Sequence, residues 1–318
     1  MSSSKTTNKK REAKKPMSAT RRREILKTWI PLYSMLAPFF IIYILFTFIP
    51  IAGGVLLSFT DFNSLQFPNF IGLENFSRLF LRDEVFLISL KNTLFLAMIM
   101  GPTSIVLSFT LAWLIRELNR PLRMFIVILL YLPSLAGVAA FTNIMKFVFA
   151  GDSYGILNSI LINSGLRADP INWLGDANYT MMTVLIVSIW SCFGLGFLSF
   201  TAGLQNLDKS YYEAAAIDGM RNRMQELYYV TLPQLWPQLM FSAVTSIAGA
   251  FTVGDINSAM TGNPSIAYST TTLRLHMMEV GTVRFEMGYA ATISLALFAM
   301  MQVTWSLTKK MLKRFNTL

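Results

Sequence analysis

The side chains that most often carry enzymatic chemistry are scarce in this chain. One histidine, His276, and one cysteine, Cys192, are present among 318 residues. A lone histidine cannot form a paired-histidine metal site, and a lone cysteine excludes a disulfide framework and a cysteine-based zinc cluster. We interpret Cys192 as a packing residue and His276 as a loop residue for which the sequence gives no evidence of a role. The sequence also lacks the Gly-x-x-x-x-Gly-Lys-Ser/Thr loop that holds nucleotide phosphates. It therefore predicts a chain that is not an enzyme and binds no metal or cofactor of its own.

Polar and charged residues gather instead in one segment, 205–233, between two long apolar runs. Ser210 and Glu213 have the spacing of a capping box, in which the serine caps a helix and the glutamate reaches back to it. Asp218-Gly219 is a turn pair, because glycine adopts positive φ without strain, and helix-forming residues resume at 220–229. We expect two short helices joined by a bend. Such an element suits either docking into a groove of a partner protein or lying on a lipid surface, and composition does not separate the two.

The elements that would position this segment are long and apolar. Hydrophobic residues make up 53% of the chain and charged residues only 14%, against roughly 25% in a soluble domain. A helix crosses a bilayer with about 20 apolar residues, and helices satisfy their own backbone hydrogen bonds in lipid. Six stretches without Asp, Glu, Lys or Arg reach that length: 32–60, 92–115, 124–145, 177–207, 227–254 and 287–308. The sequence predicts an all-α integral membrane protein with six transmembrane helices.

Prolines and connection lengths add detail to this prediction. The first three stretches contain prolines, so we expect kinks there; these are Pro38, Pro50, Pro102 and Pro133. The connection at 116–123 is long enough only to reverse the chain. The connections at 61–91, 146–176 and 255–286 have the length and the turn residues for short helices outside the membrane.

The basic residues indicate how the helices are oriented. Ten lysines and arginines lie in residues 1–30, and 20 of the 27 in the chain fall on the side of the two termini and the 205–233 segment. Because short loops rich in Lys and Arg stay in the cytoplasm, we expect both termini there. The chain then divides into a basic cytoplasmic tail (1–30), a transmembrane domain (31–309) and a cytoplasmic C-terminal tail (310–318). We interpret the basic tail as a topology signal in contact with the lipid bilayer, not as a nucleic-acid arm.

Several short motifs, in order along the chain, carry a resemblance to a known family. They are Ser58-Phe59-Thr60-Asp61 with Phe70-Ile71-Gly72-Leu73-Glu74-Asn75-Phe76, then Asn172-Trp173-Leu174-Gly175-Asp176, then Ala202-Gly203-Leu204-Gln205-Asn206, then Glu213-Ala214-Ala215 with Gly219 and Val230-Thr231-Leu232-Pro233, and finally Met287-Gly288-Tyr289-Ala290-Ala291. With these motifs the chain after residue 30 resembles permease subunits of type I ATP-binding-cassette (ABC) importers, in the carbohydrate branch that includes maltose- and lactose-type systems.

The resemblance implies a role for the 205–233 segment. In that family the segment contains the coupling helix, which sits in a cleft of the cytoplasmic ATPase. Glu213 would pair with a basic residue of the ATPase, and Gly219 would permit the bend. ATP and Mg would then be bound by the partner and not by this chain. The full set of coupling residues implied is Tyr212, Glu213, Ala214, Ala215, Asp218, Gly219, Leu232 and Pro233.

The resemblance also implies the rest of the assembly. A second homologous permease subunit, two copies of a cytoplasmic ABC ATPase and an extracytoplasmic solute-binding protein would complete an importer in a bacterial or archaeal cell membrane. The carbohydrate branch implies a sugar, with an oligosaccharide favoured over a monosaccharide. The chain departs from the family at 220–229, where ten residues stand in place of the usual nine, an addition that would turn a continuous helix by about 100°. It departs again at Thr261-Gly262-Asn263-Pro264, where the family has Thr-Gly-Gly-Gly-Pro.

Polar and aromatic residues inside the fourth and fifth stretches are candidates for a substrate path, because polar groups are costly against lipid. The candidates are Ser188, Trp190, Ser191, Phe193, Ser199, Thr252 and Asp255. Aromatic rings can stack on sugar rings, whereas small hydroxyl residues equally suit close helix packing. Two other functions stay open. A secondary transporter driven by an ion gradient would need ionisable residues within the membrane, and an ABC permease could carry a solute that is not a sugar.

Overall fold

The computed structural model describes residues 31, 33–192 and 194–315, so the basic tail at 1–30, Phe193 and the end of the C-terminal tail lie outside the described residues. The chain divides into two compact units, Met1–Gly54 and Val55–Leu318. A helical span begins in the first unit at Tyr33 and ends at Leu57. It contains the π-turn η1 (Ile44–Phe48) followed by α2 (Ile49–Leu57). The π-turn ends two residues before Pro50, whose nitrogen cannot donate a hydrogen bond to the helix.

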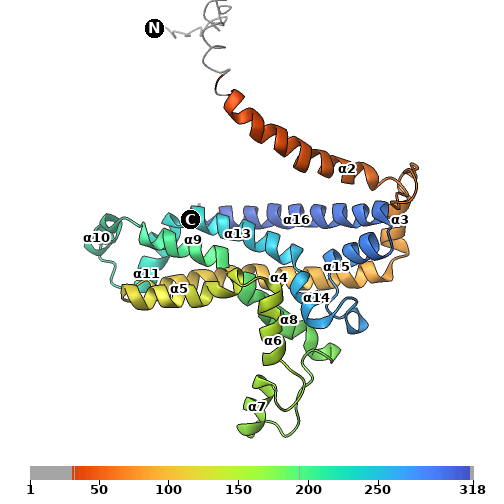
Figure 1. Cartoon of the computed structure of the whole chain (residues 1–318). Helices are drawn as coiled ribbons and strands as arrows, with labels where there is room; N and C mark the ends of the chain where they lie inside the picture. The colour runs from red at the N-terminus through yellow and green to blue at the C-terminus, as the bar shows by residue number, and fades with distance from the viewer. Residues whose placement is uncertain (1–30, 32, 193, 316–318) are drawn as a thin grey trace, which may run out of the picture. The chain divides into compact units, whose positions relative to one another are not determined.

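The second unit is built from helices, apart from a single antiparallel bridge between Thr60 and Phe70 among its described residues. Its long helices are α4 (Glu84–Ile115), α5 (Arg120–Leu135), α8 (Ala177–Cys192), α9 (Gly194–Gln205), α13 (Trp236–Thr252) and α16 (Met287–Phe315). Its short elements are α3 (Glu74–Leu81), α6 (Val138–Val148), α7 (Ile156–Asn163), α10 (Lys209–Ile217), α11 (Arg223–Glu226), η2 (Leu227–Thr231), α12 (Leu232–Gln234), α14 (Asp255–Thr261), η3 (Ile266–Tyr268), α15 (Leu273–Met278) and η4 (Glu279–Val283). Within this unit, α10 and α11 lie at one end and α3 and α15 at the other (Figure 1). We call these the α10 end and the α15 end.

The apolar stretches predicted from the sequence are helical. Within the described residues, four helices are long and apolar enough to cross a membrane: Tyr33–Leu57, Glu84–Ile115, Ala177–Gln205 and Met287–Leu312. Two bent pairs pass the same test together, α5 with α6 at 104° and α13 with α14 at 41°. The number of spans is therefore four, or up to six when each bent pair counts as one.

Proline and glycine explain the sharpest of these bends. Pro133 lies near the end of α5, and Gly137 between α5 and α6 has φ +75°, a conformation that glycine adopts without strain. The kink predicted in the third stretch is present as this break. In contrast, α4 passes Pro102 without ending, so a proline alone does not interrupt a long helix here.

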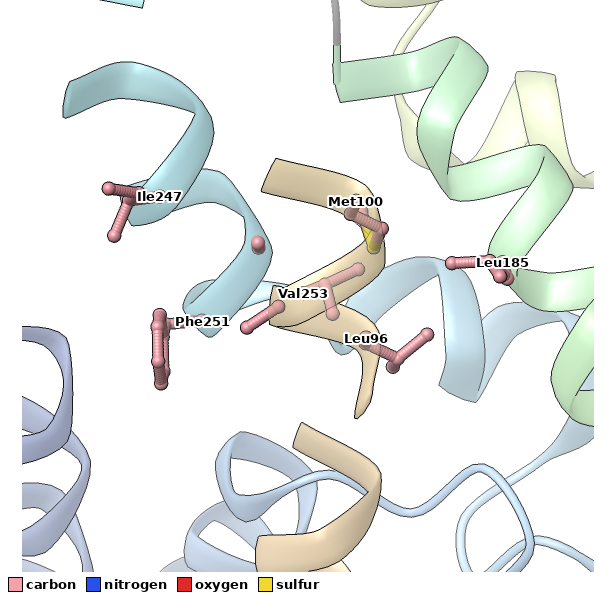
Figure 2. Close-up of a cluster of buried hydrophobic side chains, with 8 residues drawn as sticks. Leu96, Met100, Leu185, Ile247, Phe251 and Val253 are labelled. Carbon is pink, nitrogen blue, oxygen red and sulfur yellow. The ribbon is translucent and has the colours of Figure 1, made fainter. Parts of the chain in front are cut away.

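The core of the second unit lies where α4, α9 and α13 pack against one another. Figure 2 shows part of it, with Leu96 of α4 beside Leu185 of α8 and Phe251 of α13 in one buried cluster. Small residues allow the close approach of α9 and α13, because a Cβ atom added to Gly196 would lie 2.5 Å from Ser242 Oγ. Close contact through glycine and serine is how helices associate in lipid, where apolar burial gives little drive.

The connections follow the prediction in outline. The chain reverses tightly between Ile115 and Arg120, with the side chain of Asn119 capping α5. Short helices occupy the longer connections: α3 in the first, α7 in the third, and α14 and α15 in the fifth. Short helices were expected there, and the structure confirms them.

The 205–233 segment differs from the prediction in two ways. The cap of α10 is Asp208, whose carboxylate accepts a hydrogen bond from the Ser210 amide at 2.9 Å, so the capping box at Ser210 and Glu213 is wrong. Asp208 outcompetes the serine because a charged acceptor is favoured at a helix N-terminus. The second helix begins only at Arg223 and passes into η2. The segment is therefore not one α-helix, and the expected rotation of about 100° does not apply. A π-turn takes more residues per turn than an α-turn.

Candidate functional site

The predicted coupling residues of α10 separate into two sides of the helix. Glu213, Ala214 and Asp218 are exposed, whereas Ala215 is buried and Tyr212 is half-buried. Residues three apart share a helix face, so the inward side carries Tyr212 and Ala215. The outward side therefore offers a carboxylate and small side chains to another molecule.

The bend predicted at Asp218-Gly219 is present. Gly219 has φ +87°, its amide donates to the carbonyl of Ala216 at 3.2 Å, and the next amide, of Met220, donates to the carbonyl of Ala215 at 3.0 Å. This pair of bonds is the Schellman arrangement, which satisfies the last carbonyls of a helix. At the other end of α10, the Ser210 amide lowers the pKa of Asp208 below its ordinary value. Both ends of α10 are thus fixed by local bonds.

The end of the segment connects to the bundle. Val230 and Thr231 in η2 are buried, Leu232 is half-buried and Pro233 is exposed. Pro233 is the second residue of α12, which follows η2 directly, and as a proline it has no amide to donate to the turn before it. Leu235, just after α12, is fully buried in the same cluster as α4 and α9 side chains. The predicted residues Leu232 and Pro233 therefore join η2 to α13.

A second polar site lies at the α15 end, and it overturns the interpretation of His276. This side chain is 1% exposed, on α15, and its Nε2 lies 2.8 Å from Oδ2 of Asp83, the N-cap of α4. Because a carboxylate oxygen can only accept, Nε2 carries the hydrogen. Tyr289 of α16 donates its hydroxyl to the same oxygen at 2.5 Å. Burial acts to raise the pKa of Asp83, but the bonds from His276, Tyr289 and the Phe86 amide outweigh it and hold that pKa well below its ordinary value.

An ion pair extends this site toward a cavity. Arg78 of α3 bonds to Glu286 at 2.5 Å, and its guanidinium carbon lies 4.1 Å from the centre of the Tyr289 ring. A cavity of about 480 Å³ adjoins the pair and is also lined by Glu74 and Arg82. The α15 end thus contains a buried carboxylate, Asp83, and a nearby cavity lined by charged side chains.

The structure brings three of the family motifs together at this end. The Asn75 amide nitrogen donates to the backbone oxygens of Ser58 and Thr60 at 3.0 and 2.8 Å. Thr292 donates to the same Ser58 oxygen at 3.0 Å, and the Gly288 amide donates to the carbonyl of Phe62. The motifs after the first span and at the start of the sixth stretch are therefore one packing unit.

A further buried amide, Asn158 of α7, was not singled out from the sequence. Its Oδ1 accepts from Trp173 Nε1 at 2.9 Å and from the Ile171 amide at 3.1 Å. Its nitrogen, with two hydrogens to donate, lies within hydrogen-bond distance of three backbone carbonyls. The Asn172-Trp173 motif was the available signal, because a tryptophan in a polar connection needs an acceptor for its ring nitrogen.

The candidates for a substrate path on α8 and α9 are not gathered into one site. Ser188 is fully buried and its hydroxyl has no partner among the described residues, which fits packing better than contact with a solute. Trp190 is 39% exposed and meets Phe141 of α6 edge to face at 5.9 Å. Ser191 contributes its backbone oxygen to Ser134 Oγ, and Ser199 is half-buried. Phe193 lies outside the described residues.

The two candidates on α13 and α14 share one partner. Arg274 of α15 bonds to Asp255 at 2.8 Å and to the backbone oxygen of Thr252 at 2.8 Å. Asp255 is therefore a paired carboxylate and not a free one. The structure shows no hydrogen bond, within the residues it describes, that joins this group to the serines of α8 and α9. Nor does it bring three or more His, Cys, Asp or Glu side chains of that part of the chain together as metal ligands.

Comparison with known proteins identifies relatives over most of the chain. Residues 104–307 match the family described as binding-protein-dependent transport system inner membrane component. The probable ABC transporter permease protein YesP of Bacillus subtilis (strain 168) is 32% identical over 86% of this chain and 87% of its own length. The lactose transport system permease protein LacF of Rhizobium radiobacter is 29% identical over 90% of this chain and 95% of its own.

A solved structure has the same fold. It is a bacterial alginate ABC transporter in complex with an alginate pentasaccharide-bound periplasmic protein. Its similar chain has a TM-score of 0.77 and 21% identity, over 92% of this chain and 97% of that chain. The chain belongs to the family of binding-protein-dependent transport system inner membrane components.

Proposed function

We propose that this chain is the permease subunit of an ATP-driven importer for a saccharide, with an oligosaccharide favoured over a monosaccharide. The observation that carries the proposal is α10, a short helix with Glu213 and Ala214 uncovered and both ends fixed by local bonds. A fixed helix with an unpaired outward carboxylate is suited to a groove on another protein. The saccharide rests on the relatives, one named for lactose and one solved with an alginate pentasaccharide on its periplasmic protein.

In this proposal the chain has six transmembrane spans, each bent pair being one span, and both termini in the cytoplasm. The distribution of lysines and arginines supports this orientation, which puts the α10 end in the cytoplasm. The α15 end, with its polar cavity, then faces the solute-binding protein. Thr252, the Asp255–Arg274 pair and Trp190 are the residues we propose for contact with the solute.

The energy enters through α10. Two ATPase subunits close on ATP and Mg, and α10 moves with the ATPase cleft because Glu213 pairs with a basic residue there. The spans that flank the 205–233 segment follow, and the cavity between this chain and a second permease subunit changes the side on which it opens. A ligand bound to one subunit thereby biases two states of another.

The test is uptake into proteoliposomes that hold this chain with its paired permease and ATPase, with the solute-binding protein outside. Labelled lactose and an alginate pentasaccharide are the first probes, followed by the saccharide that the binding protein retains most tightly. We expect uptake that requires ATP inside and is unaffected by an ionophore. Uptake driven by an ion gradient without ATP would refute the ATP-driven mechanism. ATP-driven uptake of sn-glycerol 3-phosphate but of no saccharide would refute the sugar assignment.

A further inference from the structure

The inward side of α10 is attached to two other elements through one hydroxyl group. Tyr212 Oη lies 3.2 Å from Nη1 of Arg116, at the end of α4, and 3.1 Å from Oγ1 of Thr231, the last residue of η2. The guanidinium carbon of Arg116 is 4.9 Å from the centre of the Tyr212 ring, which is within cation–π range. One side chain of α10 therefore touches α4 and the turn that leads into α13.

The chemistry of the groups gives these bonds one direction. A guanidinium can only donate, so Tyr212 Oη accepts from Arg116 and its own hydrogen is free for Thr231. Thr231 in turn donates to the backbone oxygen of Glu226 at 3.3 Å. The result is a chain of donors from Arg116 through Tyr212 and Thr231 to Glu226, in which each bond polarises the next.

The surroundings distinguish this link from the other polar contact at the same end. Thr231 is 1% exposed and Tyr212 is half-buried, whereas the neighbouring ion pair of Arg223 with Glu117 has both side chains more than half exposed. Exposed ion pairs contribute little, so the hydroxyl chain is the stronger connection. A cavity of about 150 Å³ lined by Arg116, Glu117 and Arg223 lies beside it.

We infer that Tyr212 is a positioning residue that makes α4 and η2 move together with α10. This inference rests on the proposed function, because it concerns how movement of a docked α10 reaches the membrane spans. With the hydroxyl present, displacement of α10 pulls on the end of α4 and on the start of α13 at once. Without the Tyr212 hydroxyl, α10 can still dock through its outward side, but its movement is transmitted less fully to the membrane spans. ATP is then hydrolysed with less solute moved.

The experiment measures solute uptake and ATP hydrolysis together in proteoliposomes that hold the complete importer. Tyr212→Phe keeps the ring beneath Arg116 and removes the hydroxyl, and Thr231→Val removes the next member of the chain. We expect each variant to lower the number of solute molecules moved per ATP by about 10-fold, the loss for one intramolecular hydrogen bond. The double variant should be no worse than either single variant, because both break one chain. Tyr211→Phe is the matched control, since Tyr211 is 58% exposed.

The outcomes separate this inference from the proposed function. If the wild-type complex shows no ATP-driven uptake, the proposed function fails. If the wild type transports and Tyr212→Phe keeps the wild-type ratio of uptake to hydrolysis, only the inference fails. It also fails if the variant lowers the amount of assembled complex but leaves that ratio unchanged, because a purely structural contact would do so. Arg116→Lys retains a donor and should keep more of the ratio than Arg116→Leu, which has none; the reverse order would contradict the direction of the chain.

Discussion

The two ends of the second unit differ in whether a carboxylate is buried and bonded or exposed. At the α15 end, Asp83 is 12% exposed and is held by His276 and Tyr289. At the α10 end, Glu213 is exposed and has no partner within the described part of the chain. The first carboxylate is hydrogen-bonded inside the protein. The carboxylate of the second end is exposed, as the proposed docking to an ATPase requires.

The difference separates a carboxylate that stabilises the fold, Asp83, from one that contacts a partner in the proposed importer, Glu213. Breaking a buried, hydrogen-bonded pair leaves an uncompensated group in the interior and costs about 3–5 kcal/mol. Changing an exposed charge away from any partner costs the fold less than about 0.5 kcal/mol. Carboxylate substitutions at the two ends should therefore separate transport from stability.

The largest effect is expected for Glu213→Lys. In the proposed complex it places a cation against a basic residue of the ATPase, and like charges in an interface cost several kcal/mol. Uptake should fall to background, at least roughly 100-fold, while the melting temperature in detergent stays that of the wild type. The measurement is ATP-driven uptake together with a thermal melt.

Glu213→Gln provides the matched control, because it keeps the size of the side chain without the reversed charge, and it should retain part of the uptake. If Glu213→Lys transports at the wild-type rate, α10 is not docked through this carboxylate. If it lowers the melting temperature instead, the exposed position would be carrying the fold, and the comparison of the two ends would break.

The reverse pattern is expected for Asp83→Asn. Asparagine has one acceptor oxygen where aspartate has two, so it cannot accept both from the Phe86 amide and from His276 with Tyr289. The free energy of unfolding should fall by about 3 kcal/mol. Because the folded-state pKa of Asp83 is lowered, its contribution is complete above the unfolded pKa of about 3.9 and is lost as the pH falls through the lower folded value. The gap in melting temperature between wild type and variant should be widest near pH 6 and shrink below about pH 4.

Glu84→Gln, one residue further along and exposed, should leave both the melting temperature and its pH profile unchanged. A gap for Asp83→Asn that stays constant from pH 4 down to about pH 2 would show that the charge of Asp83 is not what holds the α15 end.

What the sequence could predict divides along the same line. The apolar stretches predicted the helices because length and hydropathy act locally, and Asp218-Gly219 predicted the turn because positive φ is a property of one residue. His276 was misread because its partner, Asp83, is 193 residues away, a distance over which no pattern is visible. Ser210 was misread for a different reason. Two neighbouring residues could both cap α10, and only the folded geometry shows that Asp208 does.

The coupling residues were predicted as one group, but the structure divides them. Tyr212 was grouped with Glu213 because the two are adjacent in the motif. On a helix, adjacent residues point about 100° apart, and Tyr212 turns toward Arg116, 96 residues earlier. The role proposed for the exposed residues follows from the resemblance alone. The role of the inward residues could be inferred only from tertiary contacts.

An intermediate effect is expected for Gly219→Ala. At φ +87° a Cβ atom costs about 1–2 kcal/mol, although no neighbouring atom lies within 4 Å of its position. The strain should loosen the end of α10 without unfolding the bundle, so uptake should fall roughly 10-fold at an unchanged melting temperature.

Gly165→Ala is the matched control, because Gly165 has φ +72° with equally open surroundings but lies after α7. An equal loss of uptake in Gly165→Ala would show that backbone strain at any position is enough to reduce transport.

The smallest effect is expected at the exposed ion pair of Arg223 and Glu117. The Nη1 atom of Arg223 lies 2.8 Å from Oε2 of Glu117, and the two side chains are 69% and 61% exposed, respectively. A double-mutant cycle with Arg223→Ala and Glu117→Ala should give a coupling free energy of about 0.2–1 kcal/mol, and 1 M salt should remove it because screening acts on exposed charges. This pair joins α11 to the end of α4, close to the point where Tyr212 joins α10 to the same helix. A salt-resistant coupling free energy, as large as the free energy equivalent to the fall in solute moved per ATP in Tyr212→Phe, would contradict this expectation. The α10 end would then be held by charge as firmly as the α15 end. The contrast between the two ends would not explain how α10 can move.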